Sequence, residues 1–234
     1  MSSSQQTAEQ AAAEWEDMFA GGKMPYTEEP LPSVQAIIEK HLALAASELV
    51  AIDVGAGSGR AVRWMLQKLA FQTVVAIEPT KNGCQALRDV LTRYSPSGSA
   101  RTIEDTAQHG LSGLVRERNL VGKADLILWD SVLSFLPEAD RVPALADSLK
   151  LLRCGTGIIV VTAHPDEKPG DTDWVANLLR AAAAETDDSK TSDQPSGVSL
   201  EFLEANAVAP FKMTFDGEQI EAAFAVTVAR VGSH

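Results

Sequence analysis

The sequence predicts an α/β protein built on a doubly wound parallel sheet. Short apolar segments such as 49–54 are typical of strands that are buried on both faces. Segments with apolar residues at helical spacing alternate with these strands along the chain, as in βαβ units. Glycines follow the first strand directly, and ligands of open parallel sheets bind at such a strand-to-helix turn.

Composition limits the possible partners. The 234 residues are enough for one α/β domain with a substantial core, and the 45% hydrophobic content is ordinary. The formal net charge of −12 argues against nucleic acid as the main partner, because no basic stripe is present to replace counterions. The sequence contains no apolar run of membrane-spanning length, and residues 1–10 are polar rather than leader-like. We therefore expect a cytoplasmic protein with no membrane partner.

The amino-terminal segment is predicted to be separate from the main domain. Residues 8–20 have a helical pattern that includes Trp15 and Phe19, and residues 21–32 are rich in glycine and proline. A second helix is predicted from Ser33, which is a suitable N-cap residue. These features predict an N-terminal segment over 1–32 and a main domain over 33–234.

The spacing of the first glycine turn distinguishes between two cofactors. The turn reads Gly55-Ala56-Gly57-Ser58-Gly59, whereas a dinucleotide fingerprint has the spacing G-x-G-x-x-G. Asp53 precedes the turn, and a carboxylate about 4 Å from a phosphate is repelled by about 4 kcal/mol at an effective dielectric constant of about 20. The same carboxylate attracts an ammonium group, so the pattern favours S-adenosylmethionine over NAD. The alternative is an ordinary tight turn, because glycine adopts positive φ easily.

Acidic residues follow two more predicted strands. The strand 73–78 ends at Glu78, which comes 23 residues after Gly55, close to the offset of about 20 at which an acid reaches a ribose diol. Residues 99–104 form a weak third strand that leads to Asp105 and Thr106. In the helix between them, Cys84 lies at a core position, and neither Cys84 nor Cys154 belongs to a metal-like cluster.

The remaining strands place further polar residues near the same edge. A fourth strand over 125–129 ends at Asp130, and a fifth over 157–162 leads to His164. The helix between them contains Pro143, which is tolerated if it falls in the first turn. Residues 171–185 are predicted to be an extra helix within an insertion over about 164–198. A short helix from Ser199 then precedes a hairpin of strands at 211–215 and 220–228.

The string AIDVGAGSG resembles the first motif of the class I S-adenosylmethionine-dependent methyltransferases, and the order of elements from Leu49 to Ala163 continues the resemblance. The segment Val132-Leu-x-x-Leu-Pro137 is similar to the family's fourth motif, although 151–157 departs from the usual proline-glycine-glycine turn. The resemblance implies a Rossmann-like sheet of seven strands in the order 3-2-1-4-5-7-6 with strand 7 antiparallel. The cofactor-binding residues that it implies are Asp53, Gly55, Ala56, Gly57, Gly59, Glu78, Pro79, Asp105, Thr106 and Asp130.

Within that resemblance, Glu78 corresponds to the ribose-binding acid and Pro79 lies beside the adenine. Asp105 accepts a hydrogen bond from the adenine amino group, helped by backbone near Thr106. The product of such a reaction is S-adenosylhomocysteine.

The amino-terminal pattern W-x-x-x-F-x-x-G-x-x-P-Y-x-x-x-P is similar to the opening of methyltransferases related to the thiopurine and tellurite-resistance enzymes. This similarity implies that residues 1–32 form an N-terminal helical lid, in which Trp15, Phe19 and Tyr26 cover a small, partly apolar acceptor. Ser134 is a further candidate on the substrate side, and the helix around Trp174 forms the opposite wall. The alternative is a helix that packs its aromatic residues on the domain.

Methyl transfer from a sulfonium requires in-line positioning and exclusion of water more than it requires acid or base. Where the acceptor must lose a proton, His164 and Asp130 are the candidate bases, because both are expected near the carboxyl ends of strands. No second acidic pair accompanies Asp130, so no metal is expected.

The leading hypothesis is therefore methyl transfer from S-adenosylmethionine to a small-molecule acceptor. A protein or peptide methyltransferase and a non-catalytic cofactor-binding module are alternatives. A nicotinamide-dependent oxidoreductase is disfavoured by the glycine spacing, by Asp53 and by the lack of an evident Tyr-x-x-x-Lys pair.

Overall fold

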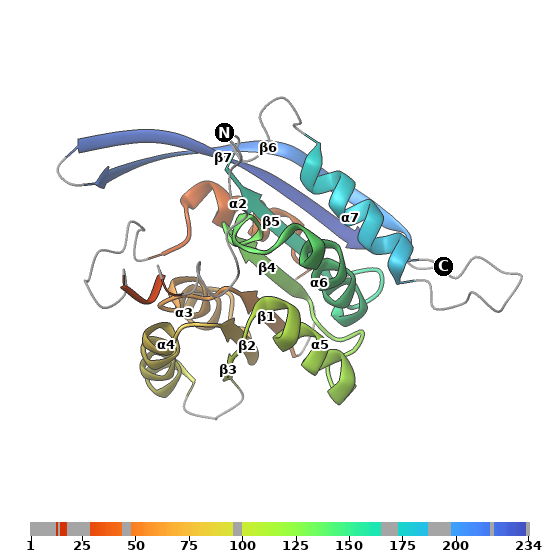
Figure 1. Cartoon of the computed structure of the whole chain (residues 1–234), viewed down its shortest axis with the longest axis horizontal. Coiled ribbons are helices and arrows are strands. Elements are labelled where there is room, and N and C mark those ends of the chain that lie inside the picture. Colours follow the sequence, from red (N-terminus) through yellow and green to blue (C-terminus); the bar gives the residue numbers. More distant parts are fainter. Residues whose placement is uncertain are drawn as a thin grey trace, which may run out of the picture.

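The computed structural model shows one seven-stranded sheet with the strand order β3-β2-β1-β4-β5-β7-β6 (Figure 1). It describes residues 13, 15–17, 29–43, 48–95, 100–164, 173–186, 198–215 and 218–232, without the side chains of 210–222. The strands are β1 (Val50–Val54), β2 (Thr73–Glu78), β3 (Arg101–Glu104), β4 (Leu126–Asp130), β5 (Ile158–Ala163), β6 (Leu200–Phe215) and β7 (Glu218–Val231).

Strands β1 to β5 pair in parallel, and β7 pairs antiparallel with both β5 and β6. The predicted fold class is confirmed, including the strand order and the reversed seventh strand. The carboxyl ends of the five parallel strands meet at one edge of the sheet, where the predicted site residues follow them.

Helices cover both faces of the sheet and form two hydrophobic clusters. The helices are α2 (Pro32–His41), α3 (Arg60–Lys68), α4 (Lys81–Tyr94), α5 (Ala107–Glu117), α6 (Glu138–Leu151) and α7 (Trp174–Glu185), with a short 3₁₀ helix, η1 (Leu133–Phe135). Residues of α2, α3 and α4 pack on one face, and residues of α5, α6 and α7 pack on the other. Alternate strand residues serve the two clusters, so Ile52 and Val54 face α5–α7 whereas Ala51 faces α2–α4.

The predicted short helix from Ser199 is wrong, because β6 begins at Leu200 and continues to Phe215. Phe202 packs against the cluster of α5–α7 and the adjacent Leu203 against the cluster of α2–α4, as neighbours in a strand do. The pairing of β6 with β7 shifts register twice between Phe202 and Ala207. These bulges interrupt the two-residue alternation, and the remaining spacing of apolar residues suggested a helix.

The predicted N-cap role of Ser33 is wrong, and the condition stated for Pro143, a place in the first turn of its helix, is not met. Pro143 lies beyond the first turn of α6, at its sixth residue, where it removes a bond to the carbonyl of Ala139. Helix α2 begins at Pro32 with Leu31 as N-cap, and Ser33 therefore lies inside the helix. Proline suits this first position because its fixed φ matches the helix and its missing N–H is not needed.

Helix α7 is the crossover between β5 and β6 and belongs to the core. Its buried residues are Trp174, Val175, Ala176, Leu179, Ala182 and Ala183. The predicted insertion over 164–198 thus contains a helix that packs on α6. No helix among the described ranges has the length and apolar character needed to cross a membrane.

Candidate functional site

The glycine turn joins β1 to α3 and brings the backbone close to the end of β2. Gly55, Gly57 and Gly59 all have positive φ, at 68°, 55° and 84°. The N–H groups of Gly55 and Ala56 donate to the carbonyl of Ile77, at 2.8 and 3.0 Å. A Cβ atom at Gly55 would overlap the side chain of Val132, which comes from the loop after β4. This turn therefore requires glycine for its backbone angles and for its close contact with the β4 loop.

Glu78 is fixed at the end of β2 by hydrogen bonds to both carboxylate oxygens. The N–H of Gly57 donates to Oε2 at 2.8 Å, and the N–H of Thr80 donates to Oε1 at 2.9 Å, with the Thr80 hydroxyl as a further donor. Burial raises the pKa of Glu78, while these hydrogen bonds lower it. The acid predicted for a ribose diol thus lies directly against the glycine turn.

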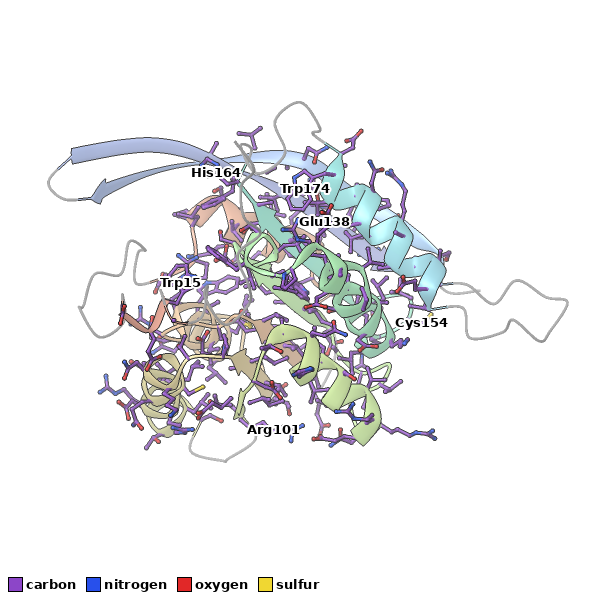
Figure 2. The ribbon with its side chains drawn as sticks, viewed as in Figure 1. Trp15, Arg101, Glu138, Cys154, His164 and Trp174 are labelled. Carbon is purple, nitrogen blue, oxygen red and sulfur yellow. The ribbon has the colours of Figure 1, made fainter. Side chains whose placement is uncertain are left out.

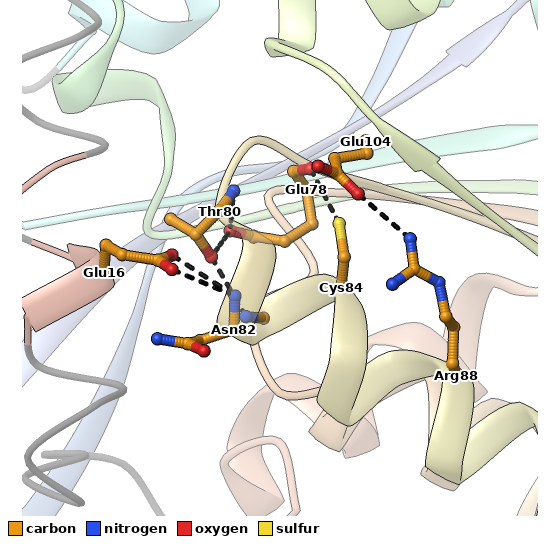
Figure 3. Close-up of polar contacts among 8 residues, drawn as sticks. Glu16, Glu78, Thr80, Asn82, Cys84, Arg88 and Glu104 are labelled. Atoms are coloured by element: carbon orange, nitrogen blue, oxygen red, sulfur yellow. Dashed lines mark hydrogen bonds and ion pairs between the residues drawn. The ribbon is translucent and has the colours of Figure 1, made fainter.

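Cys84 lies beneath Glu78 and donates a hydrogen bond to its carbonyl oxygen at 3.2 Å (Figure 3). Burial raises the pKa of the thiol to about 11, with the charge of Glu78 as a second cause. The thiol stays protonated at neutral pH, and the side chain is fully buried. The predicted core role of Cys84 is confirmed.

Asp53 is a buried carboxylate next to the glycine turn. The residue is 2% exposed, and its Oδ2 atom has no hydrogen-bond partner among the described residues. Burial raises the pKa of Asp53 well above its usual value, and the charge of Asp130 raises it further. A buried acceptor without a partner is costly, and this oxygen is therefore a candidate acceptor for a donor group of a ligand.

Asp130 ends β4 and is held by two residues of the chain. The guanidinium of Arg60 donates to Oδ2, and the hydroxyl of Thr162 donates to Oδ1 at 2.7 Å. The N–H of Ser131 donates to the Thr162 hydroxyl at 2.9 Å, and Ser131 has a φ of 62°. Sequence reasoning did not identify Arg60 or Thr162 as part of the site. For Arg60 the sequence did contain a signal: it is a cation at the first position of α3, where the helix dipole disfavours a positive charge, so an anionic partner was to be expected.

Asp105 and Thr106 follow β3, which lies beside β2 with Glu104 opposite Glu78. The N–H of Thr106 donates to Asp105 Oδ1 at 2.8 Å. The Thr106 side chain caps α5 by accepting from the N–H of His109 at 3.4 Å. Pro79 is exposed in the turn after Glu78. The predicted adenine-side residues therefore lie along the edge formed by β2 and β3.

Two described residues of the amino-terminal segment contact the elements that follow β4 and β2. The ring of Trp15 packs edge-on against Phe135 of η1, with the ring centroids 5.3 Å apart. Both carboxylate oxygens of Glu16 accept from the N–H of Asn82, at 3.3 Å, at the amino end of α4 (Figure 3). This places Trp15 and Glu16 between the loops that follow β2 and β4.

The remaining substrate-side candidates come from three elements, β5, η1 and α7. His164 follows β5 and packs edge-on against Phe224, 6.1 Å between ring centroids. Ser134 lies in η1, where its carbonyl accepts from Arg141 at 3.3 Å. Trp174 is 7% exposed within the core, with the Arg141 guanidinium 5.8 Å from its ring centroid. Trp15 and His164 lie on one side of the molecule and Cys154 on the opposite side (Figure 2). Phe19 and Tyr26 lie outside the described residues.

Asp125 occupies the opposite edge of the sheet and has a structural role. Its carboxylate accepts from the N–H of Val50 at 2.9 Å and from Arg153 at 2.7 Å. These hydrogen bonds connect the amino ends of β1 and β4, at the end of the sheet away from the glycine turn. Within the described ranges, no group of three or more His, Cys, Asp or Glu residues could hold a metal ion.

No protein-family model matches the sequence, and the search of curated proteins found no match. Solved structures do match. One is a 1,6-didemethyltoxoflavin-N1-methyltransferase from Burkholderia thailandensis with bound S-adenosylhomocysteine, at 17% identity and a TM-score of 0.66, covering 100% of this chain and 94% of that one. A putative RNA methyltransferase from Pyrococcus horikoshii matches at 13% identity and a TM-score of 0.58, covering 95% of this chain and 98% of that one.

A cyclase, SpnF, also matches, at 14% identity and a TM-score of 0.63, with 97% of each chain covered. Proteins that are named for different activities thus share this architecture, and identities this low establish the fold alone. The chain has the class I S-adenosylmethionine-dependent methyltransferase fold.

Proposed function

We propose that this protein transfers the methyl group of S-adenosylmethionine to a small-molecule acceptor. The buried Oδ2 atom of Asp53 is the observation that carries the proposal, because it needs a donor that the described chain does not supply. The cofactor has an ammonium group that can donate to this oxygen. The glycine turn and Glu78 lie beside Asp53 and match the remainder of such a ligand.

The residues that bind the cofactor lie at the ends of three strands, β1, β2 and β3. Asp53 accepts from the ammonium group, and Glu78 accepts from the ribose hydroxyls. Asp105 accepts from the adenine amino group, with Thr106 beside it and Pro79 against the ring. The bound cofactor supplies a methyl group that is already activated on a sulfonium.

The residues near β4 and β5 then position the acceptor and exclude water. Asp130 has Arg60 and Thr162 as partners, which fixes its carboxylate in one orientation. His164 is the proposed base for an acceptor that must lose a proton, because a neutral imidazole nitrogen can accept one. Ser134 and Trp174 are proposed on the acceptor side.

The segment 1–32 is proposed to act as the lid over this site. The contact of Trp15 with η1 and of Glu16 with α4 supports this role, since these elements follow the two strands that carry Asp130 and Glu78. The similarity to thiopurine- and tellurite-type enzymes assigns Phe19 and Tyr26 to the same lid. The domain 33–234 then supplies the cofactor site.

A small molecule is favoured over RNA by charge. The toxoflavin enzyme acts on a small molecule, and another structural match is named as a putative RNA methyltransferase. The net charge of −12 opposes binding to a phosphate backbone, which depends on Lys and Arg neutralising phosphates. We propose a cytoplasmic location, which fits a metabolite acceptor.

Calorimetric titration with S-adenosylhomocysteine tests the cofactor assignment. We expect micromolar binding to the wild type, weakened by Glu78→Gln about tenfold or more through loss of charged hydrogen bonds to the ribose. Glu104→Gln is a matched control, because Glu104 is the strand neighbour of Glu78 and pairs with Arg88. NAD should not bind. Binding of NAD instead of S-adenosylhomocysteine would overturn the assignment.

The acceptor class is tested with S-adenosylmethionine labelled at its methyl group and an extract divided into metabolites, RNA and protein. We expect label in the metabolite fraction. Label confined to RNA or to protein would replace the small-molecule proposal.

A further inference from the structure

We propose that Arg60 binds the α-carboxylate of the cofactor's amino-acid group, exchanging its ion pair with Asp130 for one with the ligand. This inference rests on the proposed function, since it concerns the same cofactor. It assigns Arg60 to recognition of the ligand as well as to its internal ion pair.

The first argument is the balance of charge at the site. Asp53, Glu78 and Asp130 are carboxylates at the ends of β1, β2 and β4, and Arg60 forms an ion pair with Asp130. Only 14% of the Arg60 side chain and 9% of the Asp130 side chain are exposed. A ligand that brings only an ammonium group would satisfy Asp53 but would leave the pair unchanged. A zwitterion can satisfy Asp53 and also replace both halves of the pair.

The second argument is the position of Arg60 in α3. It is the first residue of the helix, where a cation opposes the helix dipole. The N-cap, Gly59, has no side chain to accept from the first-turn N–H groups. The amino end of α3 and the guanidinium therefore attract the same anion. In the free protein Asp130 is the anion that pairs with the guanidinium.

The third argument is that Asp130 keeps a partner when the pair exchanges. The Thr162 hydroxyl donates to Oδ1, whereas Arg60 donates to Oδ2. When Arg60 turns to the ligand carboxylate, Oδ2 becomes an acceptor for the ligand ammonium, close to the open oxygen of Asp53. Arg60 and Asp130 then each have an opposite charge both before and after binding, and Asp53, which has no partner for Oδ2 in the free protein, gains one on binding.

The test uses three ligands that differ in the amino-acid group: S-adenosylmethionine, its decarboxylated analogue, and 5′-methylthioadenosine, which lacks the whole group. On the wild type we expect the decarboxylated analogue to bind about 10- to 100-fold more weakly than S-adenosylmethionine, the range for a charged hydrogen bond. This comparison involves no substitution, so it does not depend on a variant that folds.

In Arg60→Gln, S-adenosylmethionine and its decarboxylated analogue should bind with equal affinity. The affinity for 5′-methylthioadenosine should stay within about twofold of the wild-type value. Arg63→Gln, which removes the same charge from the same helix, should keep the wild-type difference. Arg60→Lys should recover part of it, because lysine retains the charge without the planar fork.

Equal affinities of the wild type for the carboxylated and decarboxylated ligands would overturn this inference. So would a loss in Arg60→Gln that is equal for all three ligands, which indicates a purely structural ion pair. Failure of the proposed function is distinguishable, because the wild type would then bind none of the three.

Discussion

At the scale of single residues, Asp53 shows how a binding site can reduce stability. Its burial without a partner for Oδ2 raises its pKa, so the folded state holds the proton more tightly than the unfolded state. Stability from such a group is present below the unfolded pKa of about 3.9 and is lost as pH rises through the folded value. The ionised carboxylate therefore destabilises the free protein at neutral pH.

We predict that Asp53→Asn stabilises the free protein at pH 8 and weakens its binding of S-adenosylhomocysteine. The gain is about 1.4 kcal/mol for each unit by which the pKa is raised. Urea unfolding at pH 4 and pH 8 measures it, and the difference from wild type should grow with pH.

Asp125→Asn is the control, because Asp125 is equally a buried acid but has Val50 and Arg153 as partners. It should lose about 2 kcal/mol of stability, since it leaves charged and polar groups unmatched. A loss of stability in both variants would contradict the account of Asp53.

At the scale of elements, glycine is required at Gly55, in the turn between β1 and α3, for two possible reasons: the backbone angle and the packing against Val132. Comparison with Gly122 separates the two. Gly55 and Gly122 both have a φ of 68°. A Cβ at Gly55 would overlap Val132, whereas nothing lies within 4 Å of the corresponding position at Gly122. Alanine at either position incurs the same left-handed strain, about 1–2 kcal/mol.

We therefore predict that Gly55→Ala loses about 1–3 kcal/mol more stability than Gly122→Ala, the usual range for overpacking. Denaturant midpoints of the two variants, measured with unchanged slopes, provide the comparison. Equal losses would show that Val132 moves aside and that only the backbone angle requires glycine.

Elements with a strong local pattern could be predicted from the sequence. The glycine turn, the strand ends and the core position of Cys84 depend on residues that are close in the chain. The sequence predicts a helix from Ser199 where the structure has a strand from Leu200, because the bulges break the two-residue alternation and the pairing with β7 stabilises the strand.

The partners of the site acids could not be predicted for a different reason. Arg60 and Asp130 are 70 residues apart, and Thr162 is 32 residues beyond Asp130. Only the parallel packing of β1, β4 and β5 brings them together. Motif spacing identifies the acids, but the cation that neutralises one of them depends on tertiary structure.

At the scale of the whole molecule, the site links the sheet to the helices on either side of its carboxyl edge. Contacts at the glycine turn join β1, β2, α3 and the loop after β4. A ligand that bridges these elements binds the folded chain alone and therefore stabilises it by mass action. Thermal stability in the presence of ligand should report on the cofactor without knowledge of the acceptor.

We predict that S-adenosylhomocysteine at about 100 times its Kd adds about 2.7 kcal/mol of stability. For a chain of this size, that corresponds to a rise in Tm of about 5–11 °C, at about 2–4 °C per kcal/mol. Asp53→Asn should melt at a higher temperature than wild type without ligand and respond less to it, because the substitution removes both the burial penalty and the ammonium contact. NAD at the same concentration is the control, because the glycine spacing of the turn after β1 argues against a dinucleotide. A comparable shift with NAD would show that the glycine turn accepts a pyrophosphate beside Asp53, against the electrostatic reasoning that favours a ligand with an ammonium group.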